Sequence, residues 1–183
     1  MQIEETKLKG CFHITPKVFK DERGYFFESF NQNNFNKEVG EQVTFVQDNQ
    51  SQSSFGVIRG LHLQLGDNAQ AKLVRAIEGT ILDVAVDLRP ESATYGYHVS
   101  FILSAENKQQ LFIPRGFAHG FSVLSEKATI HYKADNFYAA KAESGIIYND
   151  KDLNIDWQLK QEEIITSQKD LLLPTLKQFK NEQ

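Results

Sequence analysis

The sequence predicts an all-β protein, most readily a jelly roll. Short runs rich in Val, Ile, Phe and Tyr recur between polar turns, at roughly the eight-to-twelve-residue spacing that is typical of β-sandwiches and barrels. Helical periodicity is confined to two short segments. A jelly roll also has an interior wide enough for a small ligand, lined by polar side chains among aromatic ones.

The expected elements follow the apolar runs in chain order. Strands are predicted at residues 24–30, 43–47, 57–64, 72–77, 81–88, 97–103, 110–113, 121–124 and 128–134. Short helices are predicted at residues 32–38 and 158–165. Glu78-Gly79-Thr80 is a Gly-containing hairpin signal between two of the strands. In the second arm of this hairpin four apolar residues share one face, and Asp83 and Asp87 lie on the other.

Composition sets the broad class of the protein. The chain of 183 residues is expected to form one domain, residues 1–183, because no linker, repeat or low-complexity segment divides it. A net charge of −4 gives no reason to expect nucleic acid or an anionic membrane as a partner. The single cysteine, Cys11, excludes an intramolecular disulfide and a cysteine-based zinc site. Without a signal-peptide core or a long apolar stretch, a cytoplasmic location is expected.

His62 is the first candidate for chemistry, in the segment Arg59-Gly60-Leu61-His62-Leu63-Gln64. Histidine is well suited to proton abstraction near neutral pH, because its ordinary pKa is about 6.5. Two other interpretations stay open on residue chemistry alone. A hydrogen-bonded structural histidine is the commoner case, and a metal site could join His62 to His119 and Glu78. Gln64 stands where a His-x-His pair would place its second ligand, which weakens the metal pattern.

Three further residues lie on other expected elements. Lys72 has alternating neighbours, and this pattern narrowly favours a solvent-facing side chain over an inward ammonium that stabilises a negative charge. Tyr132 could be a general acid or part of an aromatic wall. His119 follows a Pro-Arg-Gly turn and could begin a strand, oriented by Asp83, or lie in a loop.

Several motifs, in a characteristic order, cover roughly residues 3 to 175. They are DERGYFFESF at 21–30, FVQDN at 45–49, RGLHLQ at 59–64, KLVR at 72–75, DVAVDLR at 83–89, LSAEN at 103–107, IPRGFAHGF at 113–121 and NIDW at 154–157. Together they resemble the dTDP-4-dehydrorhamnose 3,5-epimerases, a family of the cupin-type jelly-roll superfamily.

This resemblance implies an isomerase that needs no metal or redox cofactor. A ketone at C4 of the sugar acidifies the protons at C3 and C5, so a base can form an enolate and an acid can reprotonate the opposite face. By resemblance His62 is the base, Tyr132 the proton donor and Lys72 the cation at the enolate oxygen. Asp170, in Thr166-Ser167-Gln168-Lys169-Asp170, matches the carboxylate that fixes the tautomer of the histidine.

The resemblance also implies a dTDP-sugar ligand and a homodimer. Arg23, Arg59 and Lys169 match residues near the diphosphate, whose oxygens a guanidinium can pair with. The other implied substrate-binding residues are Glu28, Gln47, Asp48, Asn49, His119, Tyr138, which matches the aromatic stacked on thymine, and Glu143. Part of the N-terminal region of a subunit reaches its partner's site, so Arg23 and Glu28 are expected to serve the neighbouring subunit.

Strand periodicity raises one difficulty with this set. Arg59 and His62 have opposite parity, so a regular strand would point them to opposite faces. Gly60 could mark a bulge that brings both to one face. The sequence also departs from its relatives at Leu63, in the loop 65–70 and at Gln168, and none of these departures removes a proposed catalytic group.

Three alternatives to the 3,5-epimerase remain open at this point. The closest is a single-centre epimerase acting on a related dTDP-4-keto sugar. The second is a non-catalytic sugar-binding jelly roll, and the third is a metal-dependent cupin dioxygenase.

Overall fold

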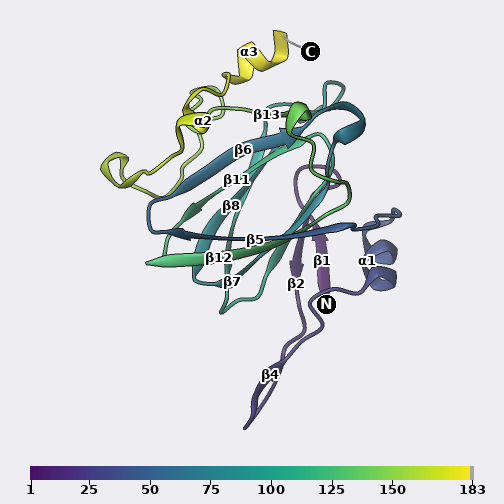
Figure 1. Cartoon of the computed structure of the whole chain (residues 1–183). Coiled ribbons are helices and arrows are strands. Elements are labelled where there is room, and N and C mark those ends of the chain that lie inside the picture. Colours follow the sequence, from purple (N-terminus) through teal and green to yellow (C-terminus); the bar gives the residue numbers. More distant parts are fainter. Residues whose placement is uncertain (182–183) are drawn as a thin grey trace.

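Two antiparallel β-sheets face each other in the computed structural model, which describes residues 1–181 (Figure 1). In spatial order the larger sheet contains β1 (Gln2–Glu5), β2 (Phe12–Thr15), β10 (Gln110–Ile113), β7 (Lys72–Glu78), β12 (Lys127–Ala134) and β5 (Gln47–Ser54). The smaller sheet contains β13 (Glu143–Gly145), β6 (Ile58–Gln64), β11 (Phe117–Val123), β8 (Thr80–Asp87) and β9 (His98–Ser104). The predicted all-β jelly roll is confirmed.

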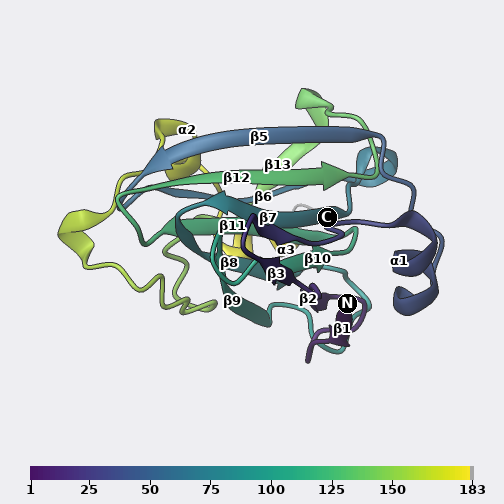
Figure 2. The ribbon, with the colours of Figure 1, turned by 90° about the horizontal axis from the view of Figure 1, so that it is seen from below.

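A hairpin of β3 (Phe19–Asp21) and β4 (Gly24–Phe26) projects from these sheets (Figure 1). The helices are short. They are α1 (Gln32–Val39), α2 (Gln168–Leu171) and α3 (Leu176–Asn181), with 3₁₀ turns at Gly66–Asn68, Ala140–Ala142 and Gln161–Glu163. Both views place α2 near β6 and α1 at the opposite end of the molecule (Figures 1 and 2). None of the helices within residues 1–181 has the length and apolar character needed to cross a membrane.

The central strand β8 shows how the core is arranged. Its residues Leu82, Val84 and Val86 pack outward against the C-terminal segment, which contributes Trp157. The opposite face of β8 points between the two sheets, into a second apolar cluster. The alternation noted in the sequence is therefore correct, and the face that carries Asp83 is buried between the two sheets.

Most predicted elements are confirmed, with shifts at their ends. The strands at 57–64, 72–77, 81–88, 97–103, 110–113 and 128–134 and the helix at 32–38 all form. The strand predicted at 121–124 begins earlier, at Phe117, and only Gly24–Phe26 of the predicted strand 24–30 is extended in a ladder.

Two predicted elements are wrong, and so is the hairpin predicted at Glu78-Gly79-Thr80, because β7 and β8 belong to different sheets and do not pair. Of the strand predicted at residues 43–47 only Gln47, which begins β5, is in a strand, and residues 43–46 form a loop because Val43 and Phe45 pack with α1 on the outer face of the larger sheet. Residues 158–165 contain only the 3₁₀ turn, and the chain then extends so that Ile165 bridges to Val57. In both segments the apolar residues contact distant parts of the chain, so their spacing does not reflect a regular strand or helix.

Candidate active site

The strand β6 carries an extra residue between Arg59 and His62. Their partners on β11 are two positions apart, whereas they themselves are three positions apart on β6. Gly60 lies at this irregularity with φ of 119°, which favours glycine, and a Cβ there would approach the Cα of Gly120 to 2.6 Å. The bulge expected at Gly60 is confirmed, and Arg59 and His62 line the same cavity.

His62 is paired with Asp170, which the chain brings back from 108 residues away. Nε2 of His62 lies 2.8 Å from Oδ1 of Asp170, and the other carboxylate oxygen accepts the backbone N–H of Gly60 at 3.3 Å. Ser167 caps α2 by accepting the backbone N–H of Asp170. Because an ionised carboxylate only accepts hydrogen bonds, Nε2 of His62 carries the ring proton and Nδ1 is left as the acceptor.

Electrostatics keep this histidine basic but uncharged. Burial is the main influence on the pKa of His62 and lowers it below 6.5, while Asp170 and Glu143 oppose the shift. A neutral imidazole with a free Nδ1 is the form that can accept a proton at neutral pH.

Lys72 points into the interior from the larger sheet. On β7 it shares a face with Val74, which belongs to the interior core, and Tyr132 packs against the same core from β12. Burial lowers the pKa of Lys72 from 10.5 to about 8, and the charges of Asp83 and Glu143 act in the opposite direction. The solvent-facing interpretation of Lys72 was therefore wrong, because strand alternation alone did not identify the inner face.

Tyr132 keeps its proton at neutral pH. Its phenol is partly buried, and burial is the main cause that raises its pKa above the ordinary 10, although the charge of Arg59 opposes it. A protonated phenol beside a cavity can donate a hydrogen bond or a proton.

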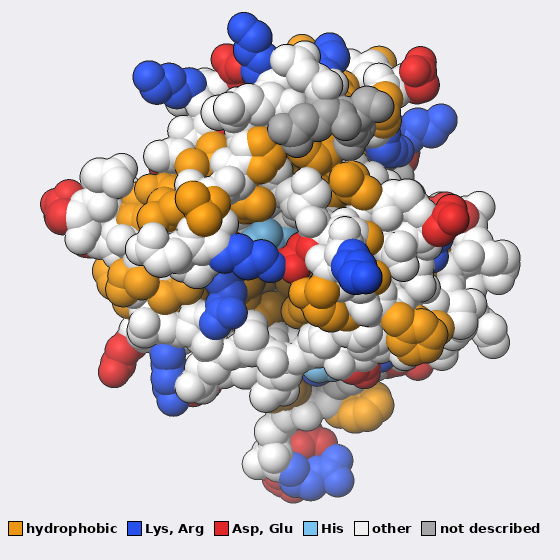
Figure 3. Space-filling model, turned by 45° about the horizontal axis from the view of Figure 1, so that its top comes forward, with side chains coloured by type: hydrophobic (Ala, Val, Ile, Leu, Met, Phe, Trp, Pro, Cys, Tyr) orange, Lys and Arg blue, Asp and Glu red, His pale blue; other side chains and the backbone are white. Residues whose placement is uncertain are grey.

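These side chains converge on one cavity of about 480 Å³, within the usual size range of small-molecule sites. The residues that line it are Ser51, Val57, Ile58, Arg59, His62, Lys72, His119, Phe121, Tyr132, Ile165, Thr166, Ser167 and Asp170. In Figure 3 a histidine is visible in a hollow of the surface, with basic and acidic side chains and hydrophobic ones around it. The cavity thus combines an acid–base set with an apolar wall.

His119 lies within β11 and not in a loop. Its Nε2 is 2.7 Å from Oδ1 of Asp83, the partner considered from the sequence, and both side chains are buried. The structure therefore places a second histidine–aspartate pair beside the first, since His119 stands opposite His62 in the ladder between β11 and β6.

At one side of the cavity Tyr138, Glu143 and Lys169 form a polar cluster. Oε2 of Glu143 accepts the hydroxyl of Tyr138 at 2.8 Å and the ammonium of Lys169 at 2.6 Å. β13, which begins at Glu143, pairs with β6 next to His62. Three expected substrate-binding residues thus meet beside the candidate base.

The three candidates on β5 divide between its two faces. Gln47 and Asn49 are half-buried, bond to each other at 3.0 Å and share their face with Ser51 of the cavity. Gln47 also accepts the backbone N–H of Tyr138. Asp48 points the other way and pairs with Lys133 at 2.9 Å, so it does not reach this cavity.

Arg23 and Glu28 are not brought to the site of their own chain. Arg23 lies at the turn of the projecting β3–β4 hairpin, with its side chain 86% exposed and paired with Asp21. Glu28 bonds to Asn31 near the start of α1. Neither residue lines the cavity that contains His62.

The residues considered for a metal site are not assembled. Glu78 bonds to Lys127 and Thr129 near the far end of β7, away from the pair formed by His62 and His119 across the ladder. Within residues 1–181 no three His, Cys, Asp or Glu side chains form a group that could hold a metal ion.

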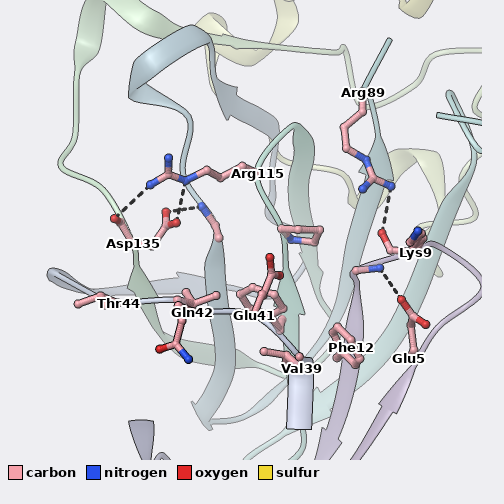
Figure 4. A pocket seen from close by; sticks show the side chains of 16 residues that line it. Glu5, Lys9, Phe12, Val39, Glu41, Gln42, Thr44, Arg89, Arg115 and Asp135 are labelled. Carbon is pink, nitrogen blue, oxygen red and sulfur yellow. Dashed lines mark hydrogen bonds and ion pairs between the residues drawn. The ribbon is translucent and has the colours of Figure 1, made fainter. Parts of the chain in front are cut away.

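A larger hollow of about 750 Å³ lies elsewhere, beside the segment that follows α1 (Figure 4). Several of its charged groups are already bound: Arg115 pairs with Asp135 at 2.7 Å, and Glu5 accepts a backbone N–H. The described residues that line it include no histidine or tyrosine. The smaller cavity, which has a candidate base and acid, is therefore the candidate active site.

Comparison with known proteins gives a consistent answer. The family model described as dTDP-4-dehydrorhamnose 3,5-epimerase matches residues 5–178. The chain belongs to this family. It is 51% identical over 178 residues to the dTDP-4-dehydrorhamnose 3,5-epimerase of Salmonella typhimurium, with 97% of each chain covered.

Solved structures of dTDP-4-dehydrorhamnose 3,5-epimerases have the same fold. The enzyme from Elizabethkingia anophelis superposes with a TM-score of 0.94 at 53% identity, covering 97% of both chains. The dTDP-6-deoxy-D-glucose-3,5-epimerase from Legionella pneumophila, solved in complex with dTDP-4-keto-L-rhamnose, has a TM-score of 0.94 at 44% identity, and the match covers 99% of this chain and 95% of that one. The resemblance seen in the motifs is thereby confirmed.

Sequence reasoning missed several groups in this epimerase site. Ser53 accepts the guanidinium Nε–H of Arg59 at 2.9 Å and so orients it. Phe121 and Ile165 form part of the apolar wall of the cavity. The alternation of polar side chains along β5 was a usable signal for Ser53, but nothing local to Ile165 indicates that it folds back beside Val57.

Proposed function

We propose that the chain catalyses the epimerisation of dTDP-4-dehydro-6-deoxy-D-glucose at C3 and C5 to dTDP-4-dehydro-L-rhamnose. The observation that carries this proposal is the convergence of the His62–Asp170 pair, Lys72 and Tyr132 on one cavity. Membership of the dTDP-4-dehydrorhamnose 3,5-epimerase family supports the choice of substrate.

The groups in the cavity fit a proton transfer in both directions. Nδ1 of His62 takes the proton from a carbon beside the ketone, and the electron pair moves onto the C4 oxygen to form an enolate. The ammonium of Lys72 stabilises this oxygen, in an interior where water screens the charge only weakly. Tyr132 then donates its proton to the opposite face of the same carbon. His62 returns its proton to solvent and Tyr132 regains one, so no metal or redox cofactor takes part.

The remaining polar groups suit the nucleotide portion of the substrate. Arg59 bonds to Ser53 and Gln52 and has further guanidinium N–H groups without a partner within residues 1–181. Lys169 lies on α2 in the polar cluster with Glu143, so both side chains can pair with diphosphate oxygens. Tyr138 has an exposed ring that can stack on a base. We also propose that the enzyme is a homodimer, in which Arg23 and Glu28 complete the partner's site. We further propose that it is located in the cytoplasm.

Turnover of dTDP-4-dehydro-6-deoxy-D-glucose in deuterated water tests the proposed reaction. Because the proton that leaves and the proton that returns are held by different side chains, deuterium is expected at both C3 and C5 of the product, and NMR shows where it is. Label at one carbon only would indicate a single-centre epimerase. Absence of label from both carbons would contradict catalysis on this substrate, and a loss of rate after dialysis against a chelator would contradict the metal-free mechanism.

The variant His62→Ala tests the assignment of the base. We expect deuterium exchange to fall to background, because the variant removes the imidazole that takes the substrate proton, and His119, the second imidazole of the cavity, is assigned to substrate binding. His131→Ala is the matched control, since His131 lies on the outer face of β12 beside Asp48 and should keep wild-type exchange. Full exchange in His62→Ala would assign the base elsewhere.

A further inference from the structure

We propose that Asp83 is a positioning residue that supplies the buried negative charge for Lys72 while it orients His119. The inference rests on the proposed function, in which Lys72 acts as a cation at the enolate oxygen. Asp83 itself lies behind His119 and is not among the residues that line the cavity.

The first observation is the state of the Asp83 carboxylate. Asp83 lies on the central strand β8, faces the interior and has no exposed surface. One oxygen, Oδ1, is bound by Nε2 of His119 at 2.7 Å. The other oxygen is buried and has no hydrogen-bond partner within residues 1–181. A buried carboxylate oxygen is costly unless a cation compensates its charge.

The second observation is that Lys72 extends into the same interior from the facing sheet. Its ammonium forms no ion pair or hydrogen bond with the residues that the structure describes. The titratable groups around this part of the cavity are His62 on β6, His119 on β11, Tyr132 on β12, Asp83 on β8, Glu143 on β13, Asp170 on α2 and Arg59 on β6.

Elimination among the acidic groups points to Asp83. Both oxygens of Asp170 are bound, one by His62 and one by Gly60. Glu143 is held by Lys169 and Tyr138. Of these three carboxylates, only Asp83 has an oxygen that is fully buried and has no hydrogen-bond partner within residues 1–181, and its charge also has the largest favourable effect on the protonated form of Lys72.

This arrangement explains how Lys72 can be both buried and charged. Without Asp83, desolvation would favour the neutral amine near neutral pH. A neutral amine would stabilise an enolate oxygen far less than an ammonium. The same carboxylate requires a proton on Nε2 of His119, which leaves Nδ1 of that ring as an acceptor for a substrate hydroxyl.

Titration of Lys72 tests the inference without using activity. The full-length enzyme is acetylated with trace acetic anhydride at a series of pH values, and mass spectrometry gives the extent of labelling at Lys72. In Asp83→Asn we expect its apparent pKa to fall by about one unit or more. Asp87→Asn is the matched control, since Asp87 is a buried carboxylate on the same strand that is bound by Arg89, Ser92 and Thr94. An unchanged Lys72 pKa in Asp83→Asn overturns the inference.

Kinetics provide the second readout. In Asp83→Asn the alkaline limb of kcat should move to lower pH, with kcat at neutral pH reduced by on the order of 10-fold to 100-fold, whereas Asp83→Glu should restore part of the rate. In a Lys72→Met background the Asp83→Asn change should lower kcat by much less than it does in the wild-type enzyme, because only the effect through His119 remains. Independent, multiplying losses would overturn the inference. If Asp83→Asn does not fold, the Lys72 titration of Asp83→Glu against wild type decides.

The two proposals fail in different ways. Loss of the proposed function would appear as no turnover of the dTDP-keto sugar by the wild-type enzyme. The Lys72 titration would still give its answer in that case, because it does not depend on a substrate.

Discussion

Burial lowers the pKa of both His62 and Lys72, but the consequences for the proposed reaction are opposite. Burial favours the neutral form of His62, and this is the form that a base requires. It also favours the neutral form of Lys72, although the enolate requires a charged ammonium. The reaction therefore requires a pH above the pKa of His62 and below the pKa of Lys72. Tyr132 adds no limit near neutral pH, because burial raises its pKa further.

The pH dependence of kcat/KM should be bell-shaped. The pKa of His62 is lowered, so the neutral base persists down to pH 6.5 and the acid limb lies below that value. Lys72 loses its proton with a pKa of about 8, so the alkaline limb lies near pH 8. Initial rates across pH 5 to 10 check both limbs, and an acid limb above pH 6.5 would contradict the account of His62.

Asp170→Asn should reduce kcat by on the order of 10² to 10⁴ with little change in KM. The amide no longer requires a proton on Nε2 of His62, so the ring loses the tautomer that leaves Nδ1 free. Steady-state kinetics give the split between kcat and KM. Asp152→Asn, an exposed aspartate in the C-terminal segment, is the control and should behave as wild type. A change confined to KM would mean that Asp170 contacts the substrate and does not orient the base.

At the scale of elements, the strand β5 was not predicted from the sequence because it is polar throughout. β5 reads Gln-Asp-Asn-Gln-Ser-Gln-Ser-Ser and has no apolar alternation. Its inner face carries Gln47, Asn49 and Ser51 because it borders the cavity rather than the core. β6, in contrast, was predicted well, since apolar residues there pack under the C-terminal segment. A strand that lines a ligand site is thus the kind that hydrophobic periodicity misses.

The bulge in β6 gives a prediction at this scale. Gly60→Ala should lower the free energy of unfolding by about 2–4 kcal/mol, because φ is positive and the Cβ meets the backbone of β11. The rate should also fall, since the Gly60 N–H holds Asp170. Urea denaturation and kcat measure both effects.

Gly66→Ala is the matched control for this variant. Gly66 also has a positive φ, but a Cβ there meets nothing within 4 Å. It should lose only about 1 kcal/mol of stability from backbone strain and keep its rate. Equal losses in the two variants would mean that the close contact with β11 has no particular role.

At the scale of the whole molecule, the β3–β4 hairpin is the feature that one chain does not explain. It projects from the sheets (Figure 1) and exposes Phe19, Tyr25 and Phe26. Exposed aromatic residues in one place are typical of a surface that another protein covers. This agrees with the proposal that Arg23 and Glu28 serve a second copy of the chain.

Mixed dimers test that proposal directly. Arg23→Ala and His62→Ala are each expected to have little activity, but a heterodimer of the two contains one site with both residues intact if Arg23 acts across the interface. Co-expression with two affinity tags isolates this species, and its kcat should recover to roughly half the wild-type value per dimer. No recovery in a purified heterodimer would place Arg23 outside the partner's site.

The sequence by itself determined the fold class, most strands of the smaller sheet, half of those of the larger sheet and the family, because these depend on local periodicity and on motifs that can be read along the chain. Tertiary structure decided which groups act together. The inward face of Lys72, the outward face of Asp48 and the return of Asp170 to His62 all depend on contacts between distant segments. The bulge at Gly60 was partly predictable, because a regular strand would point Arg59 and His62 to opposite faces. Only the structure shows that the backbone of Gly60 packs against Gly120 at the bulge.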